Sequence, residues 1–490
     1  MRRLSFTLCW FLLILPLSAE ERIPDRPERL EFPELQYEVP DRDQFRAVLD
    51  NGVALYAAED RLLPLVAIQV FFKGGAYLEP QGMEGLASLT GTVWRTGGAG
   101  DLTAEEFDEE LDFLAANLST GIGGVTGSVS LNLLSKDLER GLQLLMDVLL
   151  RPRFQESRLE TARTNLLSEM RQRNDSTAGI ESREWNRLIY GDDYWINRHS
   201  TQASVRSIDR DDLVRFQQRL IDPASMVVAA AGDFHRDELI ELLNETIGRL
   251  ETRSEPIPPA PQPSHRSEPG VYLVDKPDVN QGRVSIGHLG AMRPLEDEFD
   301  IRVANDILGG SGFTSRITSR VRSDEGLAYT AGSAFGIGQE YPGTFRSLFQ
   351  SRSEACARAA ELTVELIRGM HADGVTDEEL RTSKNSQIET LPNNFQTMIQ
   401  TVSLFARDEL AGRPPDYWAA FRDNVRAVSV ESAHQAFRRH INPERLVILV
   451  VGNIEEILGG DPDHPDSRFE NLGALHRIPL RDPMTLEPME

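Results

Sequence analysis

Arg322 and Tyr329 are the residues of this sequence whose types and spacing best suit a chemical role. They flank Gly326 in the run GGSGFTSRITSRVRSDEGLAYTAGSAF, residues 309–335. Apolar residues four apart predict a helix over about 314–324, and glycine is a typical helix end because it accepts the left-handed conformation. A strand would then carry the tyrosine, so a guanidinium and a phenol could both donate hydrogen bonds to one carbonyl oxygen. The same pair also fits a solvated helix arginine and a half-buried strand tyrosine.

Length, charge and the first residues limit the class of protein. The chain has 490 residues, enough for two or more domains, and its net charge of −25 argues against nucleic acid and anionic membrane surfaces as partners. Residues 1–19 combine a basic start, a short apolar run and a small-residue end, which predicts a secretory signal peptide; an uncleaved membrane anchor is the alternative. We expect an exported protein, periplasmic in a Gram-negative source, with no membrane span after cleavage. Only Cys356 would then remain, which excludes an intrachain disulfide.

The sequence repeats itself. Residues 206–234 align without gaps with residues 426–454, at an offset of 220, and residues 66–68 match residues 284–286 at an offset of 218. Two matches in the same order at nearly one offset indicate a duplicated domain of about 220 residues. Between the copies, five prolines from 256 to 263 predict a stiff, extended linker.

Hydrophobic patterns predict the fold class. Residues 66–72 and 129–133 alternate between apolar and other side chains, as strands with one buried face do, whereas residues 138–149 carry a helical stripe. Thr103 and Glu106 form a capping-box pattern that opens another helix. We expect an α+β fold of two tandem homologous domains, each a mainly antiparallel sheet covered by helices on one face, forming a clam-like bowl. The expected divisions are a signal peptide (1–19), an extended segment (20–47), the first domain (48–250), the linker (251–268), the second domain (269–455) and a tail (456–490).

The duplication and the run LGGSGFTSRITSRVRSDEGLAYTAGSAF together resemble the insulinase/pitrilysin family of zinc metallopeptidases, especially its bacterial and mitochondrial-processing-type members. The resemblance extends over nearly all of residues 40–455. In that family, an Arg and a Tyr seven residues apart, around R-x-x-x-G-L-A-Y, contact the substrate at the scissile bond. The resemblance therefore implies that Arg322 and Tyr329 are substrate-binding residues.

The zinc motif of the family is degenerate in this sequence. The family holds zinc with H-x-x-E-H on a helix, in which the Glu polarises the water, and with a downstream Glu as third ligand. Here Ser88 and Thr92 occupy the histidine positions, and Gly91 occupies the general-base position. None of the nine histidines precedes residue 199. Glu169 falls near the place of the third ligand and is at most a remnant, so we expect no metal and no other cofactor in this chain.

Loss of the metal motif with retention of the Arg/Tyr pair points to a role in a complex. In several members of the family one subunit carries H-x-x-E-H, and a homologous subunit carries the Arg and Tyr. The resemblance thus implies a non-catalytic subunit of an exported heterodimeric zinc peptidase, with zinc in the partner and a peptide as substrate. Such a chain would support metalloendopeptidase activity without having it alone. The alternatives are a non-proteolytic scaffold and a stand-alone peptide-binding protein of the same fold.

Overall fold

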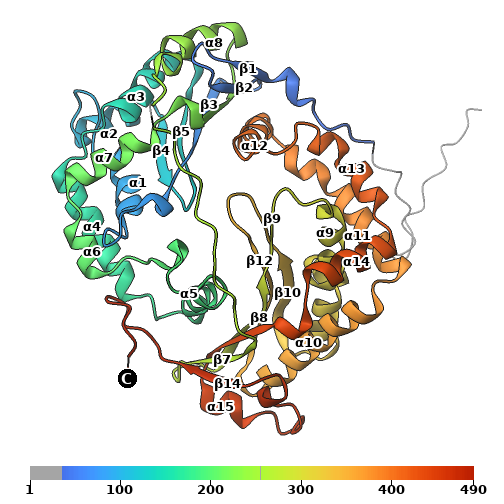
Figure 1. Ribbon diagram of the computed structural model, residues 1–490. Coiled ribbons are helices and arrows are strands. Elements are labelled where there is room, and N and C mark those ends of the chain that lie inside the picture. Colours follow the sequence, from blue (N-terminus) through green and yellow to red (C-terminus); the bar gives the residue numbers. More distant parts are fainter. Residues whose placement is uncertain (1–35, 254, 490) are drawn as a thin grey trace, which may run out of the picture. The chain divides into compact units, whose positions relative to one another are not determined.

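The computed structural model describes residues 36–253 and 255–489 (Figure 1). The predicted signal peptide, residues 1–19, lies outside the described residues, and so does most of the predicted extended segment. No helix of the described residues is long and apolar enough to cross a membrane. Two six-stranded sheets organise the rest, one in the first half of the chain (residues 38–250) and one in the second half (residues 270–489).

The first sheet is mixed, with one parallel pair of strands. Its strands run in the order β1-β2-β6-β3-β5-β4; β2 and β6 are parallel, and the other neighbours are antiparallel. The strands are β1 (Arg46–Val48), β2 (Ala54–Glu59), β3 (Leu65–Lys73), β4 (Asn117–Ile122), β5 (Thr126–Leu134) and β6 (Met226–Gly232). The helices of this half are α1 (Leu86–Thr96), α2 (Ala104–Phe113), α3 (Leu138–Leu150), α4 (Glu156–Arg171), α5 (Thr177–Tyr190), α6 (Gln202–Ser207), α7 (Arg210–Leu220) and α8 (Arg236–Glu245).

The second sheet repeats this order. Its strands run β10-β12-β8-β13-β7-β14, so β7, β13, β8, β12 and β10 take the places of β2, β6, β3, β5 and β4. The strands of this half are β7 (Gly270–Asp275), β8 (Gln281–Leu289), β9 (Ala291–Met292), β10 (Ala328–Phe335), β11 (Ile337–Gly338), β12 (Thr344–Arg352), β13 (Val447–Gly452) and β14 (Leu475–Ile478). Its helices are α9 (Glu298–Asn305), α10 (Cys356–Asp373), α11 (Asp377–Glu389), α12 (Met398–Leu410), α13 (Tyr417–Ala427), α14 (Val430–His440) and α15 (Ile454–Gly459). The predicted α+β class is confirmed, whereas the predicted domain boundaries stay a prediction.

The strand registers correct one detail of the repeat. Ile68 pairs with Ala230 in the first sheet, and Val284 pairs with Val450 in the second. Because Ala230 and Val450 correspond at the offset of 220, Ile68 corresponds to Val284, an offset of 216 instead of 218. A shift of two residues leaves every side chain on the same face of the strand, so the hydrophobic pattern alone could not distinguish these two offsets.

Each sheet is covered on both faces, and one cover comes from the other half of the chain. Helix α12 of the second half packs against β2, β3 and β6, where its Phe405 lies 6.2 Å from the ring of Tyr56. Helix α5 of the first half packs against β8 and β13 of the second sheet. These two helices occupy matching places in the element order, after α4 and α11. The structure thus adds a reciprocal exchange of helices to the prediction of sheets covered on one face.

Charged side chains hold each exchanged helix on its sheet. Glu409 on α12 accepts hydrogen bonds from Arg46 at 2.8 and 2.9 Å, from Arg42 at 2.6 Å and from Tyr56, all in the first half. These donors hold the pKa of the Glu409 carboxyl at about 2, with Arg46 as the largest cause. Glu181 on α5, almost fully buried, pairs in the same way with arginines of the second sheet. Charge-assisted bonds of this kind set the register of each exchanged helix on its sheet.

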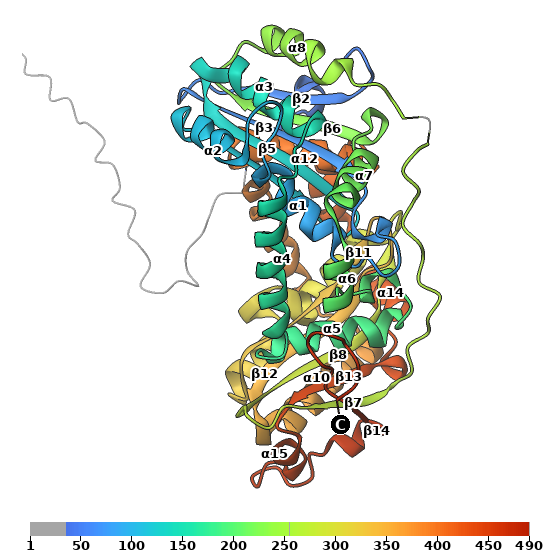
Figure 2. The ribbon, with the colours of Figure 1, turned by 90° about the vertical axis from the view of Figure 1, so that its left-hand side faces the viewer.

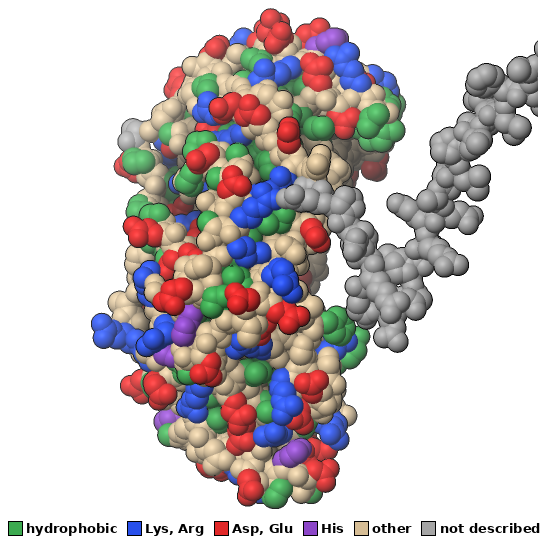
Figure 3. All heavy atoms as spheres, turned by 90° about the vertical axis from the view of Figure 1, so that its right-hand side faces the viewer, with side chains coloured by type: hydrophobic (Ala, Val, Ile, Leu, Met, Phe, Trp, Pro, Cys, Tyr) green, Lys and Arg blue, Asp and Glu red, His purple; other side chains and the backbone are tan. Residues whose placement is uncertain are grey.

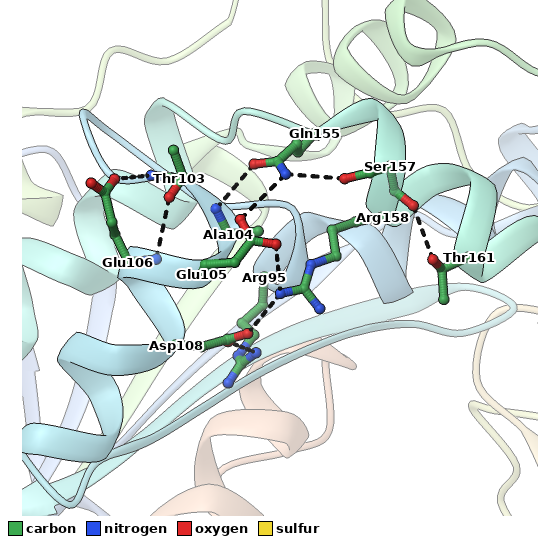
Figure 4. Close-up of polar contacts among 10 residues, drawn as sticks. All are labelled: Arg95, Thr103, Ala104, Glu105, Glu106, Asp108, Gln155, Ser157, Arg158 and Thr161. Carbon is green, nitrogen blue, oxygen red and sulfur yellow. Dashed lines mark hydrogen bonds and ion pairs between the residues drawn. The ribbon is translucent and has the colours of Figure 1, made fainter.

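The capping box predicted at residue 103 is present (Figure 4). The backbone N–H of Glu106 donates to the hydroxyl of Thr103 at 3.2 Å, and the Glu106 carboxylate accepts from the backbone N–H of Thr103 at 2.8 Å. Gln155 accepts from the N–H of Ala104 at 3.1 Å, which ties the start of α2 to the start of α4. Phe107 is then buried one turn into α2, so the capping residues and the apolar stripe agree on the start of the helix.

Acidic and basic side chains alternate on the surface shown in Figure 3, and they form no wide patch of one sign there. Elsewhere in the described chain, many charged side chains are paired across short distances, such as Arg439 with Asp297 at 2.7 Å. The net charge of −25 is therefore not concentrated on this face. Surface pairs of this kind contribute little to stability, and the sheets and their exchanged helices carry most of the buried area.

Candidate functional site

The helix that carries Arg322 starts later than the sequence predicts. Residues 312–314 form a separate 3₁₀ turn, and the helix begins at Arg316 and continues as a π-helix over Thr318–Asp324. Gly312 opens the turn with a left-handed φ of +61°, and Ser315, between the turn and the helix, has an extended backbone (φ −81°, ψ 151°), so the helix starts two residues after the predicted position 314. Gly326 also has a left-handed φ, +62°, and directly follows the helix, as predicted.

Tyr329 lies at an irregularity of the edge strand β10. Strand β10 pairs antiparallel with β12, but the register shifts between Ala328 and Thr330, so Tyr329 is the extra residue of a β-bulge. A bulge re-aims the side chain of its extra residue. The Tyr329 side chain is accordingly 81% exposed, which contradicts the alternative of a half-buried strand tyrosine.

The structure brings Arg322 and Tyr329 into direct contact and adds a third residue, Phe313, for which the sequence predicts no role. The Arg322 guanidinium carbon lies 5.0 Å from the ring centroid of Tyr329 and 4.4 Å from that of Phe313. Phe313 is 67% exposed, unusual for a large apolar side chain without a partner. Its only signal in the sequence is an aromatic residue inside a glycine-rich run.

No described residue pairs with the charge of Arg322 by a hydrogen bond or an ion pair. Its neighbour Arg320, in contrast, is 2.9 Å from the carboxylate of Glu325. Stacking on aromatic rings uses the faces of the guanidinium plane and leaves its N–H edges free, and these edges match carboxylate and carbonyl oxygens. The arginine is therefore positioned as a donor toward a group that this chain does not supply.

A cavity of about 690 Å³ opens beside this pair. It is bounded by the bulged start of β10, by residues 350–352 of β12 and by Gln281 at the start of β8. Gln350 donates to Gln281 at 2.7 Å, and Arg352 is paired with Glu354 at 2.9 Å. Arg322 is thus the one cation lining this cavity whose charge is not paired within the described chain. The cavity is of the size that takes several residues of an extended peptide.

Helix α1 carries the degenerate zinc motif. Ser88 and Thr92 are both exposed and lie one turn apart on the same side of the helix, whereas Gly91 is buried. A Cβ atom at Gly91 would lie 3.1 Å from the backbone nitrogen of Ile122, so the edge strand β4 packs too closely for a larger residue without a shift. The general base of the family motif is therefore replaced by a close contact between α1 and β4.

These positions do not fit a zinc ion. Zinc in proteins takes imidazole, thiolate or carboxylate ligands, and Ser88 and Thr92 offer only neutral hydroxyls. Glu169 is exposed on α4, which packs against α1. It is a single carboxylate, and the motif positions on α1 supply no histidine to bind a metal with it. Among the described residues, no group of three or more His, Cys, Asp or Glu side chains could hold a metal.

Glu79 closes the start of α1 from inside the protein. Its carboxylate is 8% exposed and accepts hydrogen bonds from the backbone N–H groups of Ala87 at 2.7 Å and Gly85 at 3.2 Å. Burial raises the pKa of Glu79 to about 7, and the two backbone donors oppose that shift. The carboxyl thus caps α1, a position that suits the positive end of the helix dipole but lies away from solvent.

The fold and the site together define a duplicated peptidase-like protein in which the positions of the N-terminal zinc motif carry none of the usual zinc ligands. Residues 207–387 match the family described as the peptidase M16 inactive domain. The predicted relation to the insulinase/pitrilysin family is thereby confirmed.

The named relatives agree with this placement. The non-peptidase homolog YmxG of Helicobacter pylori is 22% identical over 406 residues, which cover 81% of this chain and 90% of that protein. An uncharacterized zinc protease of Mycobacterium tuberculosis is 28% identical over 326 residues, or 66% of this chain and 73% of that one. The crystal structure of a peptidase M16 inactive domain from Pseudomonas fluorescens has a TM-score of 0.75 and 22% identity, and the match covers 83% and 97% of the two chains. At this identity the structural likeness shows the fold.

Proposed function

We propose that this chain is the non-catalytic subunit of an exported two-chain zinc peptidase. The observation that carries the proposal is the Arg322 side chain, held between two exposed aromatic rings with no partner for its charge among the described residues. Ser88 and Thr92 offer only hydroxyl groups, and in this proposal the metal is held by a homologous partner that carries H-x-x-E-H. In that partner, zinc would activate water and polarise the peptide carbonyl.

In this proposal, Arg322 and Tyr329 bind the peptide and stabilise charge as it develops. The guanidinium edge and the exposed phenol can each donate a hydrogen bond to the same carbonyl oxygen. Donors that are already in place lower the barrier of a step in which a carbonyl oxygen gains negative charge, because no reorganisation is needed at that moment. Phe313 serves as a positioning residue, since its ring limits the orientations of the guanidinium.

Reconstitution tests the proposal. The mature chain is expressed alone, an H-x-x-E-H homologue from the same source is expressed alone, and both are expressed together, and each sample is assayed with a quenched-fluorescence peptide library. We expect cleavage only by the pair. Within the pair, Arg322→Ala should abolish most of the activity, whereas the matched control Arg320→Ala should not, because Arg320 already pairs with Glu325. Full activity of the homologue alone, or of the Arg322→Ala pair, would contradict the proposal and favour a scaffold.

A further inference from the structure

Each half of the chain has a cavity at the same place in its element order. In the first half, a cavity of about 800 Å³ lies between the segment before α1, at Tyr77 and Gln81, and residues 190–198 at the end of α5 and beyond. In the second half, a cavity of about 480 Å³ lies between residues 293–299 before and within α9 and residues 411–417 after α12. Because α5 and α12 are the exchanged helices of the two halves, the duplication has produced a pair of like cavities.

The cavity of the first half has the proline-rich linker as one wall. The linker runs as an extended segment from α8 to β7 (Figure 2), and its residues Pro261 and Gln262 line the cavity. The hydroxyl of Tyr77 donates to the carbonyl of Pro258 at 2.6 Å, and the hydroxyl of Tyr194 donates to that of Pro261 at 2.7 Å. Aromatic side chains that donate to proline-segment carbonyls are the usual means of recognising an extended proline-rich chain.

A third tyrosine near this cavity, Tyr190, contacts a proline of the second half in the same way. Its hydroxyl donates to the carbonyl of Pro342 at 2.8 Å, and its ring lies 6.0 Å from the ring of Tyr341, the residue before that proline. Three tyrosine hydroxyls of the first half thus each hold the carbonyl of a proline. The surface around the first cavity therefore already holds an extended, proline-containing segment, which forms one wall of that cavity.

The cavity of the second half has the same kind of walls but no linker residue among its lining residues. Its apolar surface comes from two prolines and from aliphatic and aromatic side chains, and the rings of Phe299 and Tyr417 are stacked at 5.5 Å. Arg413 lies 4.2 Å from the ring centroid of Tyr417 and is paired with Asp408 at 2.9 Å. The apolar lining residues are Pro294, Leu295, Phe299, Ala411, Pro414, Tyr417 and Ala420.

The polar groups of this second cavity are of both kinds. Arg293, Arg413, Gln339 and Asn424 line it with donors, and Glu296, Glu298 and Asp416 line it with carboxylates. Arg293 is fixed by a two-point pair with Glu298 at 2.8 and 3.0 Å, so Gln339 and Asn424 are the lining donors that carry no charge. A proline has no backbone N–H and offers only its carbonyl oxygen, which such donors can bind. Donors that are already held in place lose little side-chain entropy when they bind.

We propose that the cavity of the second half binds an extended, proline-containing peptide segment supplied by another chain. In the first half, the linker lies against the corresponding surface and forms one wall of the cavity there. The pyrrolidine rings would pack on Phe299, Leu295 and Ala420, and the segment's carbonyls would accept from Arg413 and Asn424. A volume of about 480 Å³ lies within the range of ligand pockets, about 300–1,000 Å³. This site does not depend on Arg322 or on peptidase activity.

The linker sequence itself supplies the probe. A fluorescein-labelled peptide with the sequence of residues 255–265, EPIPPAPQPSH, is titrated with the whole mature chain and followed by fluorescence anisotropy. We expect saturable binding with a Kd on the order of 10–500 μM, typical of a short segment with few anchoring contacts. Ala420→Glu, which places a long charged side chain in the cavity, should weaken binding at least tenfold. Ala419→Glu on the same helix is the matched control, because Ala419 is exposed and does not line the cavity.

A second variant and a second peptide keep the test decisive. Asn424→Asp replaces an exposed donor by an acceptor that repels carbonyl oxygens, so it should weaken binding without affecting folding. A peptide with every proline changed to alanine should bind at least tenfold more weakly. The proposal is overturned by the absence of saturable binding up to about 2 mM, by equal affinity of the Ala420→Glu and Asn424→Asp variants, or by equal affinity of the alanine peptide. Thermal melts of all variants establish that they are folded.

Discussion

Glu79 should make the stability of the chain depend on pH in a way that one substitution removes. Its buried carboxyl has a pKa of about 7, against an ordinary value of 4.5. Because the folded-state pKa is raised, the folded state holds the proton more tightly than the unfolded state. The contribution of Glu79 to stability is therefore full below about pH 4.5 and is lost as the pH rises to about 7. Glu79→Gln keeps an oxygen that can accept from Ala87 but carries no charge.

The size of the effect follows from the difference in pKa. The difference between about 7 and 4.5 corresponds to about 3 kcal/mol at 1.36 kcal/mol per pKa unit, and most of this falls between pH 5 and pH 8. Glu79→Gln should therefore stabilise the chain at pH 8 relative to the wild type, and the gain should be small at pH 5. Residues 38–490 form one compact unit, for which an unfolding entropy of about 2.1 cal/mol/K per residue converts this gain into a rise in Tm of about 2–3 °C.

The assay is the difference in Tm between wild type and Glu79→Gln, measured by scanning calorimetry from pH 5 to pH 8. The difference isolates Glu79, because other groups titrate in both proteins. His199 is one of these groups: burial lowers its pKa to about 4, so its contribution to stability rises with pH between about 4 and 6.5. Parallel Tm profiles of the two proteins, with a constant offset, would refute the reasoning about Glu79.

Three further outcomes are expected. In the reconstituted pair, Tyr329→Phe should lower kcat by about 10²–10³-fold with an unchanged Tm, and Arg322→Ala should also raise KM. Wild-type kinetics in both variants would show that Arg322 and Tyr329 have a structural role only. Phe313→Ala removes one cation–π contact of about 0.5–1 kcal/mol, so kcat/KM should fall about two- to fivefold while Phe313→Tyr retains activity, and equal losses in both variants would argue against stacking. Glu409→Gln should lower Tm at pH 7, and the deficit should shrink as the wild-type carboxyl is protonated toward pH 2; a deficit independent of pH in this range would show that its charge is unimportant.

Local patterns in the sequence predicted local structure well. The capping box at Thr103, the helix end at Gly326 and the alternating strands depend on neighbours within a few residues, and the structure contains all three. The helix start before Arg322 was placed two residues too early because the extended Ser315 separates the 3₁₀ turn from the helix, a break that apolar spacing does not reveal. The repeat offset was misplaced by two because alternation repeats every two residues.

The candidate site depended on contacts between distant parts of the chain, which a pattern does not encode. The sequence placed Arg322 and Tyr329 at one corner, but the stacking of Phe313 on the arginine arises from the turn that begins at Gly312. The bulge at residue 329 depends on the partner strand β12. Similarly, the raised pKa of Glu79 results from burial under α1, which no feature of its neighbours in the sequence reveals.

The reciprocal exchange of α5 and α12 makes this single chain an internal counterpart of a domain-swapped dimer. Neither half completes its own core, because Tyr56 and Ala229 of the first sheet belong to the same buried cluster as Phe405 of α12. Each half made alone would expose a sheet face to solvent, a surface prone to aggregation. The linker keeps the second half near the first at an effective concentration in the millimolar range. When only the first half has emerged from the ribosome, one face of its sheet is therefore still uncovered. That face is buried only after residues 398–410 have been synthesised.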